Sequence, residues 1–272
     1  MKKTKTVILP DGNRLTGYRG ELVFDYICSR CNYTEVSLFE RWFLPRANEL
    51  HNIYDIGANI GDHAVYFATH SKANIFSFEP MPVTFEMLKK NIEQNDISDR
   101  VKLFNCALGA EDSSAKMQIV TDNMGACSIS NEGTENVQVK RLDNMNLPLP
   151  DLVKIDVEGY ELEVLKGMER TLRESSPVLW IEIFEDTETM PETYRFLSSL
   201  GYLPVDCGEL PENVLFTKQE LTAQEKAEHL WAFAIKALRQ NRKIHEAIRN
   251  SFKSSHSWKI TAPLRAIRRI FQ

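Results

Sequence analysis

A glycine-containing turn, followed at a set distance by an acidic residue, could bind a nucleoside. The segment 54–61 reads as a strand that ends in Asp55, after which Gly57-Ala58-Asn59-Ile60-Gly61 opens a helix. Glycines in such a turn let the backbone bend tightly and approach a ligand closely. Glu79 ends the next expected strand, 22 residues after Gly57, where its carboxylate can accept hydrogen bonds from both ribose hydroxyls of an adenosine.

The acids around this turn favour a cationic nucleoside over a dinucleotide. A dinucleotide fingerprint would have glycines at 57, 59 and 62, but the chain has Asn59 and Asp62. Asp62 would put negative charge at the helix N-terminus, where a pyrophosphate should bind. Asp55 adds a second carboxylate. Both repel a diphosphate but suit an ammonium and a sulfonium, so the turn predicts S-adenosylmethionine rather than NAD. The simpler alternative is a structural turn with a chance acid.

Three ionisable residues follow another apolar strand. Lys154, Asp156 and Glu158 alternate at the end of 152–155, so all three could share one side. Ligands of open α/β sheets bind outside the carboxyl ends of the strands. Ionisable groups at such a place are costly unless they are paired or used. The simpler alternative is a solvated strand end with a Lys–Asp ion pair.

If the methyl group of S-adenosylmethionine goes to a hydroxyl group, these residues could activate it, because a neutral hydroxyl needs help from a base or a metal. Asp156 is the first candidate for the base and Glu158 the second, with Lys154 holding a carboxylate or steadying developing charge. Alternatively, Asp156 and Glu158 bind Mg²⁺, since hard cations favour oxygen ligands. His63 is a further candidate base, although a lone His at the start of a helix is more often structural.

The elements that must position these residues alternate between strand and helix. Strands are expected at 52–56, 74–78, 101–106, 152–155 and 177–184, and helices at 60–70, 82–95, 160–173 and 191–200. Such alternation predicts a parallel sheet with helices on both faces, and 201–205 and 214–216 are spaced like an antiparallel pair. Further expectations are short strands around a turn within 6–24, a helix over 34–50 bent at Pro45, extended segments at 115–120, 126–130 and 136–141, and a polar helix over 219–252.

The sequence resembles the FkbM-type family of S-adenosylmethionine-dependent methyltransferases over roughly 34–216. The matching segments are Asp55–Gly61, Phe78-Glu79-Pro80, Asn105–Gly109, Leu142-Asp143, Lys154–Glu161 and Val164–Gly167. The resemblance implies an α/β, Rossmann-like class I methyltransferase fold, a doubly wound sheet of seven strands with the last antiparallel. It also implies transfer to oxygen, commonly a hydroxyl of a sugar or of a natural product.

The resemblance further implies roles and domain limits. Cofactor roles fall on residues at the strand ends: Asp55, Gly57, Asn59 and Gly61 at the methionine part, Glu79 at the ribose, and Asn105 to Ala107 at the adenine. Asp156 and Glu158 would face the transferred methyl group. The expected division is an N-terminal extension over 1–50, the methyltransferase domain over 51–217 and a basic helical tail over 218–272.

The C-terminal tail indicates an anionic or glycan partner. Residues 236–272 carry ten Lys or Arg and one Glu, whereas the rest of the chain carries 23 bases and 37 acids. The segment 254–265 resembles one near the ends of bacterial glycosyltransferases and related enzymes of surface-polysaccharide assembly. We therefore expect a saccharide or lipid-linked glycan as acceptor, with the tail on an anionic membrane surface or a glycosyltransferase. A solvated basic helix or a protein-docking tail is the alternative, and the acidic body argues against nucleic acid.

The remaining composition bounds location and cofactors. No stretch approaches the roughly 20 consecutive apolar residues of a membrane span, and the N-terminus lacks a signal-peptide pattern, so we expect a cytoplasmic protein, peripheral at the inner membrane if the tail binds there. The five cysteines are scattered, and the lone pair Cys28 and Cys31 offers at most half of a zinc site, so no residue is assigned to a metal. The composition does not decide whether the chain forms a homodimer.

Together these patterns predict an S-adenosylmethionine-dependent O-methyltransferase that acts on a sugar hydroxyl in bacterial surface polysaccharide or lipopolysaccharide biosynthesis. Two alternatives stay open. One is a non-catalytic methyltransferase-like subunit that binds the polysaccharide assembly machinery. The other is an O-methyltransferase of a small non-sugar metabolite.

Overall fold

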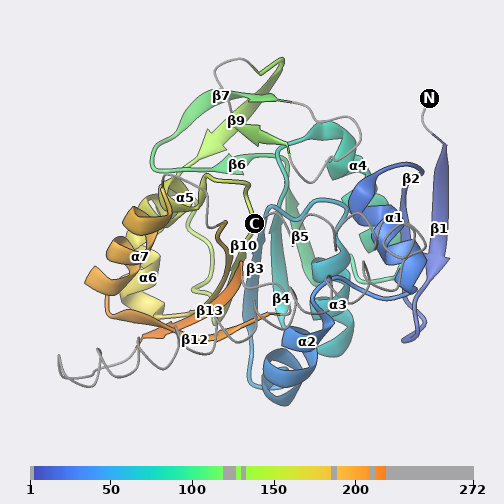
Figure 1. Cartoon of the computed structure of the whole chain (residues 1–272), viewed down its shortest axis with the longest axis horizontal. Helices are drawn as coiled ribbons and strands as arrows, with labels where there is room; N and C mark the ends of the chain where they lie inside the picture. The colour runs from blue at the N-terminus through green and yellow to red at the C-terminus, as the bar shows by residue number, and fades with distance from the viewer. Residues whose placement is uncertain (1–2, 119–126, 130–132, 185–188, 209–211, 219–272) are drawn as a thin grey trace, which may run out of the picture. The chain divides into compact units, whose positions relative to one another are not determined.

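The central feature of the fold is a sheet of seven strands, drawn in the computed structural model of Figure 1. The structure describes residues 3–118, 127–129, 133–184, 189–208 and 212–218. The chain divides into two units, Met1–Thr222 and Ala223–Gln272, and all described residues belong to the first. The expected polar helix over 219–252 and the segment 254–265 lie outside the described residues.

The sheet has the order β12-β13-β11-β10-β3-β4-β5. Its strands are β3 (Asn52–Ile56), β4 (Asn74–Phe78), β5 (Val101–Phe104), β10 (Leu152–Ile155), β11 (Val178–Glu182), β12 (Tyr202–Cys207) and β13 (Asn213–Lys218). All pairings are parallel except those of β13, which runs antiparallel to β11 and to β12. The predicted seven-stranded class I sheet with its last strand antiparallel is therefore confirmed.

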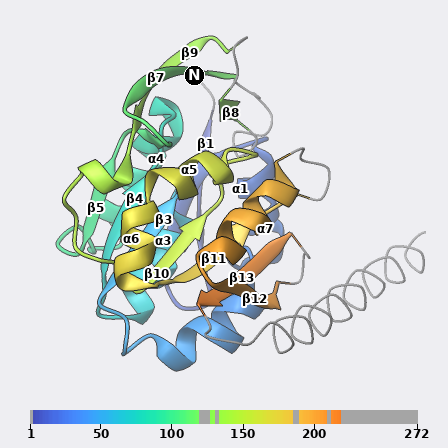
Figure 2. The same cartoon turned by 90° about the vertical axis from the view of Figure 1, so that its left-hand side faces the viewer.

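The central strands are apolar because both faces of the sheet are covered. β10 is buried at all four positions, and β3 at four of its five. Figures 1 and 2 show α5 (Glu161–Gly167), α6 (Glu169–Ser175) and α7 (Met190–Ser199) together on one face. The other face carries α3 (Asp62–His70) and α4 (Pro82–Gln94). The single helix expected over 160–173 is thus two helices, separated at Met168.

The N-terminal part differs from expectation in two places. The hairpin of β1 (Thr4–Ile8) and β2 (Arg14–Tyr18) forms as expected, but a helix, α1 (Leu22–Arg30), begins where the strands were expected to continue. The cause is Glu21, whose buried carboxylate caps the helix by accepting bonds from the backbone of Val23 and Phe24.

The single helix expected over 34–50 is also wrong. The structure has three short turns of different pitch instead: α2 (Val36–Leu38), a π-helical turn (Phe39–Phe43) and a 3-10 turn (Leu44–Arg46). Pro45 lacks the backbone N–H that an α-helix would need there. Their buried aromatic side chains pack on α3, as in the stacked pair Phe39 and Tyr66.

A second, four-stranded sheet is inserted between β5 and β10. It has the order β6-β9-β7-β8, from β6 (Ala107–Leu108), β7 (Ser113–Gln118), β8 (Ser128–Ile129) and β9 (Glu135–Lys140), and a 3-10 turn over Leu142–Asn144 follows it. The expected extended segments fall on β7, β8 and β9. Met117 and Val139 of this sheet belong to one buried apolar cluster with Met81, the N-cap of α4. Among the described residues, no helix is long and apolar enough to cross a membrane.

Candidate active site

The candidate site is a cavity of about 400 Å³ at the carboxyl ends of β3, β4, β10 and β11. Parallel strands bring these ends to one edge, which is where open α/β sheets bind ligands. The ends of these strands and the loops that follow the strands of the sheet supply most of its lining. The rest comes from α1 with the loop after it, from the start of α3 and from the inserted sheet.

The loop after β3 is held in a shape that only glycine allows at one position. Gly57 has φ +82°, and a Cβ built on it would lie 1.7 Å from the backbone oxygen of Asp156. The amides of Gly57 and Ala58 both donate to the carbonyl oxygen of Phe78, each at 2.9 Å. The loop therefore lies directly against β10 and is tied to the end of β4, and Gly57 and Asn59 line the cavity.

Glu79 stands at the end of β4, as its spacing from the loop predicts. Its carboxylate accepts hydrogen bonds from the amides of Asn59 (2.9 Å) and Met81 (2.8 Å) and from the hydroxyl of Thr84 (2.8 Å). Burial raises the pKa of Glu79 from its ordinary value to about 7, although these hydrogen bonds act in the opposite direction. The carboxylate is thus fixed at the cavity wall, and accepting capacity is left on Oε2, because it accepts one of the three bonds and has two lone pairs.

Three buried polar groups near the loop have no hydrogen-bond partner among the described residues. They are both carboxylate oxygens of Asp55, the Oδ1 atom of Asn59 and the hydroxyl of Ser77. Asp55 and Ser77 lie side by side on β3 and β4, below the cavity rather than in its lining. Burial raises the pKa of Asp55 to about 6. Unpaired buried polar atoms are costly, so the Asn59 oxygen at the cavity wall is a candidate ligand contact.

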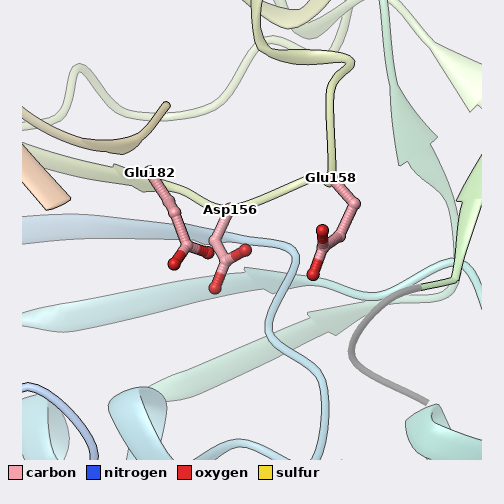
Figure 3. A group of neighbouring side chains, drawn as sticks. All are labelled: Asp156, Glu158 and Glu182. Atoms are coloured by element: carbon pink, nitrogen blue, oxygen red, sulfur yellow. The ribbon is translucent and has the colours of Figure 1, made fainter. Parts of the chain in front are cut away.

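The second group of acids lies across the cavity, at the ends of β10 and β11. Lys154 is fully buried, and its Nζ donates to Asp156 Oδ2 at 2.9 Å. The carboxyl group of Glu182, which ends β11, is hydrogen-bonded to that of Asp156. Figure 3 shows the carboxyl groups of Glu182, Asp156 and Glu158 pointing to the same side of the sheet edge. The sequence prediction that Lys154, Asp156 and Glu158 share one side of the strand end is therefore confirmed.

Burial and the charges in this group shift the pKa values of its three acids. Burial alone would raise the pKa of Asp156, but the charge of Lys154 and the hydrogen bond from Glu182 hold it below its usual range. Burial and the negative charge of Asp156 raise the pKa of Glu182. Burial, followed by Asp156, raises the pKa of Glu158 to about 7.

The side chain of Glu158 is less restrained than that of Asp156, although its backbone is strained. Glu158 adopts φ +53°, in the left-handed region that non-glycine residues rarely occupy. Within the described part of the chain, its carboxyl group makes no hydrogen bond or ion pair, unlike that of Asp156. Its side chain is therefore available to a ligand in the cavity.

His63 also lines the cavity, but it is held between two acids. Its Nε2 lies 3.1 Å from Glu35 Oε2, and its Nδ1 lies 3.4 Å from Asp62 Oδ1. Burial would lower the pKa of His63, yet the two carboxylates raise it to about 9. At neutral pH it is a paired imidazolium, which is a poor base, and it fixes the loop that carries Glu35 to the start of α3.

Other predicted site residues fall in different places. Ala107 lines the cavity, whereas Asn105 lies outside the lining and its amide donates to the carbonyl oxygens of Glu79 and Pro80. Gly61 is the N-cap of α3 and also lies outside the lining. Cys31 is exposed, and its thiol donates to the carbonyl oxygen of Ile8.

Glu182 is the functional candidate that the sequence prediction missed. The signal was present, because Glu182 follows the apolar run Val178–Ile181 just as Asp156 follows β10. In the part of the chain that the structure describes, Asp156, Glu158 and Glu182 form the one group able to offer three ligand atoms to a metal, all within 4.8 Å of one another.

Comparison with known proteins points to one family. The family model described as "Methyltransferase FkbM domain" matches residues 55–204. The hexuronic acid methyltransferase AglP of Haloferax volcanii is 36% identical over 137 residues, which cover 49% of this chain and 56% of that protein. The methyltransferase sdnD of Sordaria araneosa is 26% identical over 223 residues, with coverages of 64% and 86%.

Among solved structures, the chain is similar to the methyltransferase FkbM of Methylobacillus flagellatus KT. The TM-score is 0.51 and the identity 20%, over 66% of this chain and 47% of that chain. This likeness supports the fold. The chain spans only about half the length of that protein and of the Haloferax volcanii relative.

Proposed function

Because the chain belongs to the FkbM methyltransferase family, we propose that it methylates a hydroxyl oxygen of a saccharide. The methyl donor of this family is S-adenosylmethionine. The acceptor that we propose is a neutral saccharide or lipid-linked glycan in the synthesis of a bacterial surface polysaccharide or lipopolysaccharide. The observation that carries the proposal is the excess of carboxyl groups over unpaired cations around the cavity.

The charges of the lining support a neutral acceptor. Six acidic side chains line the cavity: Glu35, Asp62, Glu79, Asp156, Glu158 and Glu182. Among the described lining residues the only bases are Lys154 and His63, and both are ion-paired. A carboxylate brought by an anionic sugar would meet like charge and no unpaired cation, whereas a hydroxyl group can donate to carboxylates. The proposed acceptor therefore differs in charge from the hexuronic acid for which the Haloferax volcanii relative is named.

The residues present fit S-adenosylmethionine. The backbone of Gly57 and the unpaired oxygen of Asn59 both lie at the cavity wall, and this oxygen can accept a hydrogen bond from an ammonium group. We propose that these two residues hold the methionine part, that Glu79 holds the ribose hydroxyls and that Ala107 lies at the adenine. Because Asp55, Gly61 and Asn105 lie outside the lining, we propose that they position this loop and the end of β4.

The base that we propose is Glu158. When bound, S-adenosylmethionine would supply a methyl group on a positively charged sulfur. The acceptor oxygen would bond to the methyl carbon while the carbon–sulfur bond breaks. Glu158 has a pKa of about 7 and an unpaired carboxyl group, so at neutral pH it can take the proton of the acceptor hydroxyl. Asp156, the first choice from the sequence, is neutralised by Lys154 and is better suited to orienting the hydroxyl. Positioning of the two reactants supplies the rest.

A second arrangement of the same groups uses a metal. Asp156, Glu158 and Glu182 would bind Mg²⁺, and the ion would acidify the hydroxyl in place of a base. Dialysis against EDTA separates the two. Loss of turnover that Mg²⁺ restores supports the metal arrangement, and unchanged turnover supports Glu158 as the base.

The proposed function is tested with methyl-labelled S-adenosylmethionine and a matched pair of acceptors, methyl glucoside and the methyl glycoside of glucuronic acid. We expect label in the neutral glycoside and at least about tenfold less in the anionic one, since 1.4 kcal/mol of repulsion corresponds to a factor of ten. Preference for the anionic glycoside would overturn the neutral acceptor. Failure to bind S-adenosylmethionine in calorimetry would overturn the methyl transfer itself.

The basic composition of the tail favours a partner that carries negative charge. With ten basic residues against one acid over 236–272, we propose that it places the enzyme on an anionic membrane surface beside a lipid-linked glycan. Sedimentation with vesicles of phosphatidylglycerol should retain the full chain and release a chain ended at residue 218. Equal sedimentation of the two would reject this role.

A further inference from the structure

Helix α1 has apolar residues on two faces, although a surface helix normally needs only one. Phe24 and Ile27 face the core and are fully buried. Leu22 and Tyr26, one helical turn apart, lie on another side and remain 61% and 43% exposed. Both line the cavity. Large apolar side chains exposed beside a cavity indicate a surface that binds something.

The exposed face of α1 is held in place before any ligand binds. The buried carboxylate of Glu21 accepts from the amide of Phe24 at 2.7 Å and so fixes the start of the helix. The ring of Phe24 packs on Gly17 of β2 so closely that a Cβ there would lie 2.3 Å from the ring. The guanidinium of Arg30 lies 5.0 Å above the Tyr26 ring and restrains it. A contact surface fixed in this way costs little entropy on binding.

The exposed face of α1 comes from a different part of the chain than the cofactor residues. Met81, in the connection after β4, and Ala107, in β6, line the cavity together with Glu79, and they suit an adenosine. Leu22 and Tyr26 belong to a part of the chain outside the family match of 55–204. They share the cavity with Glu158, the proposed base.

We propose that Leu22 and Tyr26 form the subsite that binds the sugar ring of the acceptor. A pyranose presents a face of C–H groups, which packs on an aromatic ring by dispersion, while its hydroxyl groups need polar partners. The cavity offers both, with an apolar wall on α1 and carboxylates at the ends of β10 and β11. This subsite rests on the proposed function, because it assumes a saccharide acceptor.

The test is steady-state kinetics of full-length variants with a panel of methyl glycosides of neutral hexoses and deoxyhexoses. Tyr26→Ala should raise KM for the best glycoside of the panel at least about fivefold and leave Kd for S-adenosylmethionine within twofold. Tyr26→Phe keeps the ring and should restore the wild-type KM. Leu22→Ala should act in the same direction with a smaller effect. Ile8→Ala is the matched control, since Ile8 is 62% exposed on β1 and does not line the cavity.

The outcomes separate this subsite from the proposed function. A wild-type protein that binds S-adenosylmethionine but labels no glycoside rejects the saccharide acceptor, and the subsite with it. A wild-type protein that labels a glycoside, with Tyr26→Ala unchanged in KM, rejects the subsite alone. If Tyr26→Ala weakens S-adenosylmethionine binding as much as it raises KM, Tyr26 belongs to the cofactor site and the subsite is wrong.

Discussion

The substitution Glu79→Gln tests the cofactor assignment most directly. The carboxylate of Glu79 is fixed by three hydrogen bonds at the end of β4, so its Oε2 atom needs no rearrangement to accept a further bond from a ribose hydroxyl. A hydrogen bond to a charged group contributes about 1.5–3 kcal/mol. We therefore expect Kd for S-adenosylmethionine, measured by calorimetry at pH 8, to rise roughly 10- to 100-fold.

The pKa of Glu79 adds a dependence on pH that the variant should lose. Because this pKa lies at about 7, the wild-type protein at pH 6 is mostly protonated at Glu79 and should bind roughly tenfold more weakly than at pH 8. The pKa of Glu79 in the folded protein is raised above its ordinary value of 4.5, so protonation of Glu79 favours the folded state. This contribution to the free energy of unfolding is fully present below pH 4.5 and is lost as pH rises through 7. Over that window the free energy of unfolding falls by roughly 3 kcal/mol, and this contribution is absent in Glu79→Gln.

The control is Glu93→Gln, because Glu93 is an exposed acid of α4 that does not line the cavity. Melting curves without ligand at pH 5 and pH 8 report the change in the free energy of unfolding, and calorimetry reports the Kd for S-adenosylmethionine. Wild-type affinity that is equal at pH 6 and pH 8, together with an unchanged Kd in Glu79→Gln, would refute the ribose assignment.

Four further results are expected. Gly57→Ala should lower the free energy of unfolding, measured in urea, by more than about 3 kcal/mol, because its Cβ would overlap the Asp156 carbonyl. The control Gly159→Ala, at a residue with φ +93° and open space around it, should lose only about 1–2 kcal/mol, and equal losses would contradict the close approach at Gly57. Lys154→Met should cost about 3–5 kcal/mol in the same assay, and adding Asp156→Asn should recover part of it, whereas strictly additive losses would exclude a buried ion pair. Glu158→Gln should lower kcat roughly 10²- to 10⁴-fold and remove the ionisation near pH 7 from its pH profile, and an unchanged kcat would exclude Glu158 as the base. Binding of S-adenosylmethionine at pH 7 should release protons, seen as an enthalpy that varies with the buffer, because a cation lowers the raised pKa values of the acids.

The sheet and the cofactor loop were predictable because their signals are local. The apolar runs at 52–56, 74–78 and 152–155 each end in a polar residue or a glycine turn, and alternation with helical segments leaves a parallel sheet as the arrangement. The position of Glu79 follows from the same rule, since parallel neighbours end at the same edge. Such predictions need only the order of strands.

Features that depend on packing between distant segments were not predictable. Glu182 joins Asp156 because β11 pairs with β10, a register that the sequence does not state. The π-helical turn at 39–43 depends on the fit of buried aromatic residues to α3. The role of α1 as a cavity wall depends on its packing on β2, so its exposed apolar face had no meaning before the cavity was known.

The acids of the cavity are best understood as prepared for a cation. Burial and the charges of neighbouring acids raise the pKa values of Glu79, Glu158 and Glu182 in the free protein, and a positive charge beside these groups would lower the values again. The two lining bases cannot supply that charge because both are already paired. A sulfonium and an ammonium would relieve the same repulsion and displace protons. Such a site binds its donor more tightly as pH rises through 7, and it leaves Glu158 ionised when the acceptor hydroxyl must lose its proton.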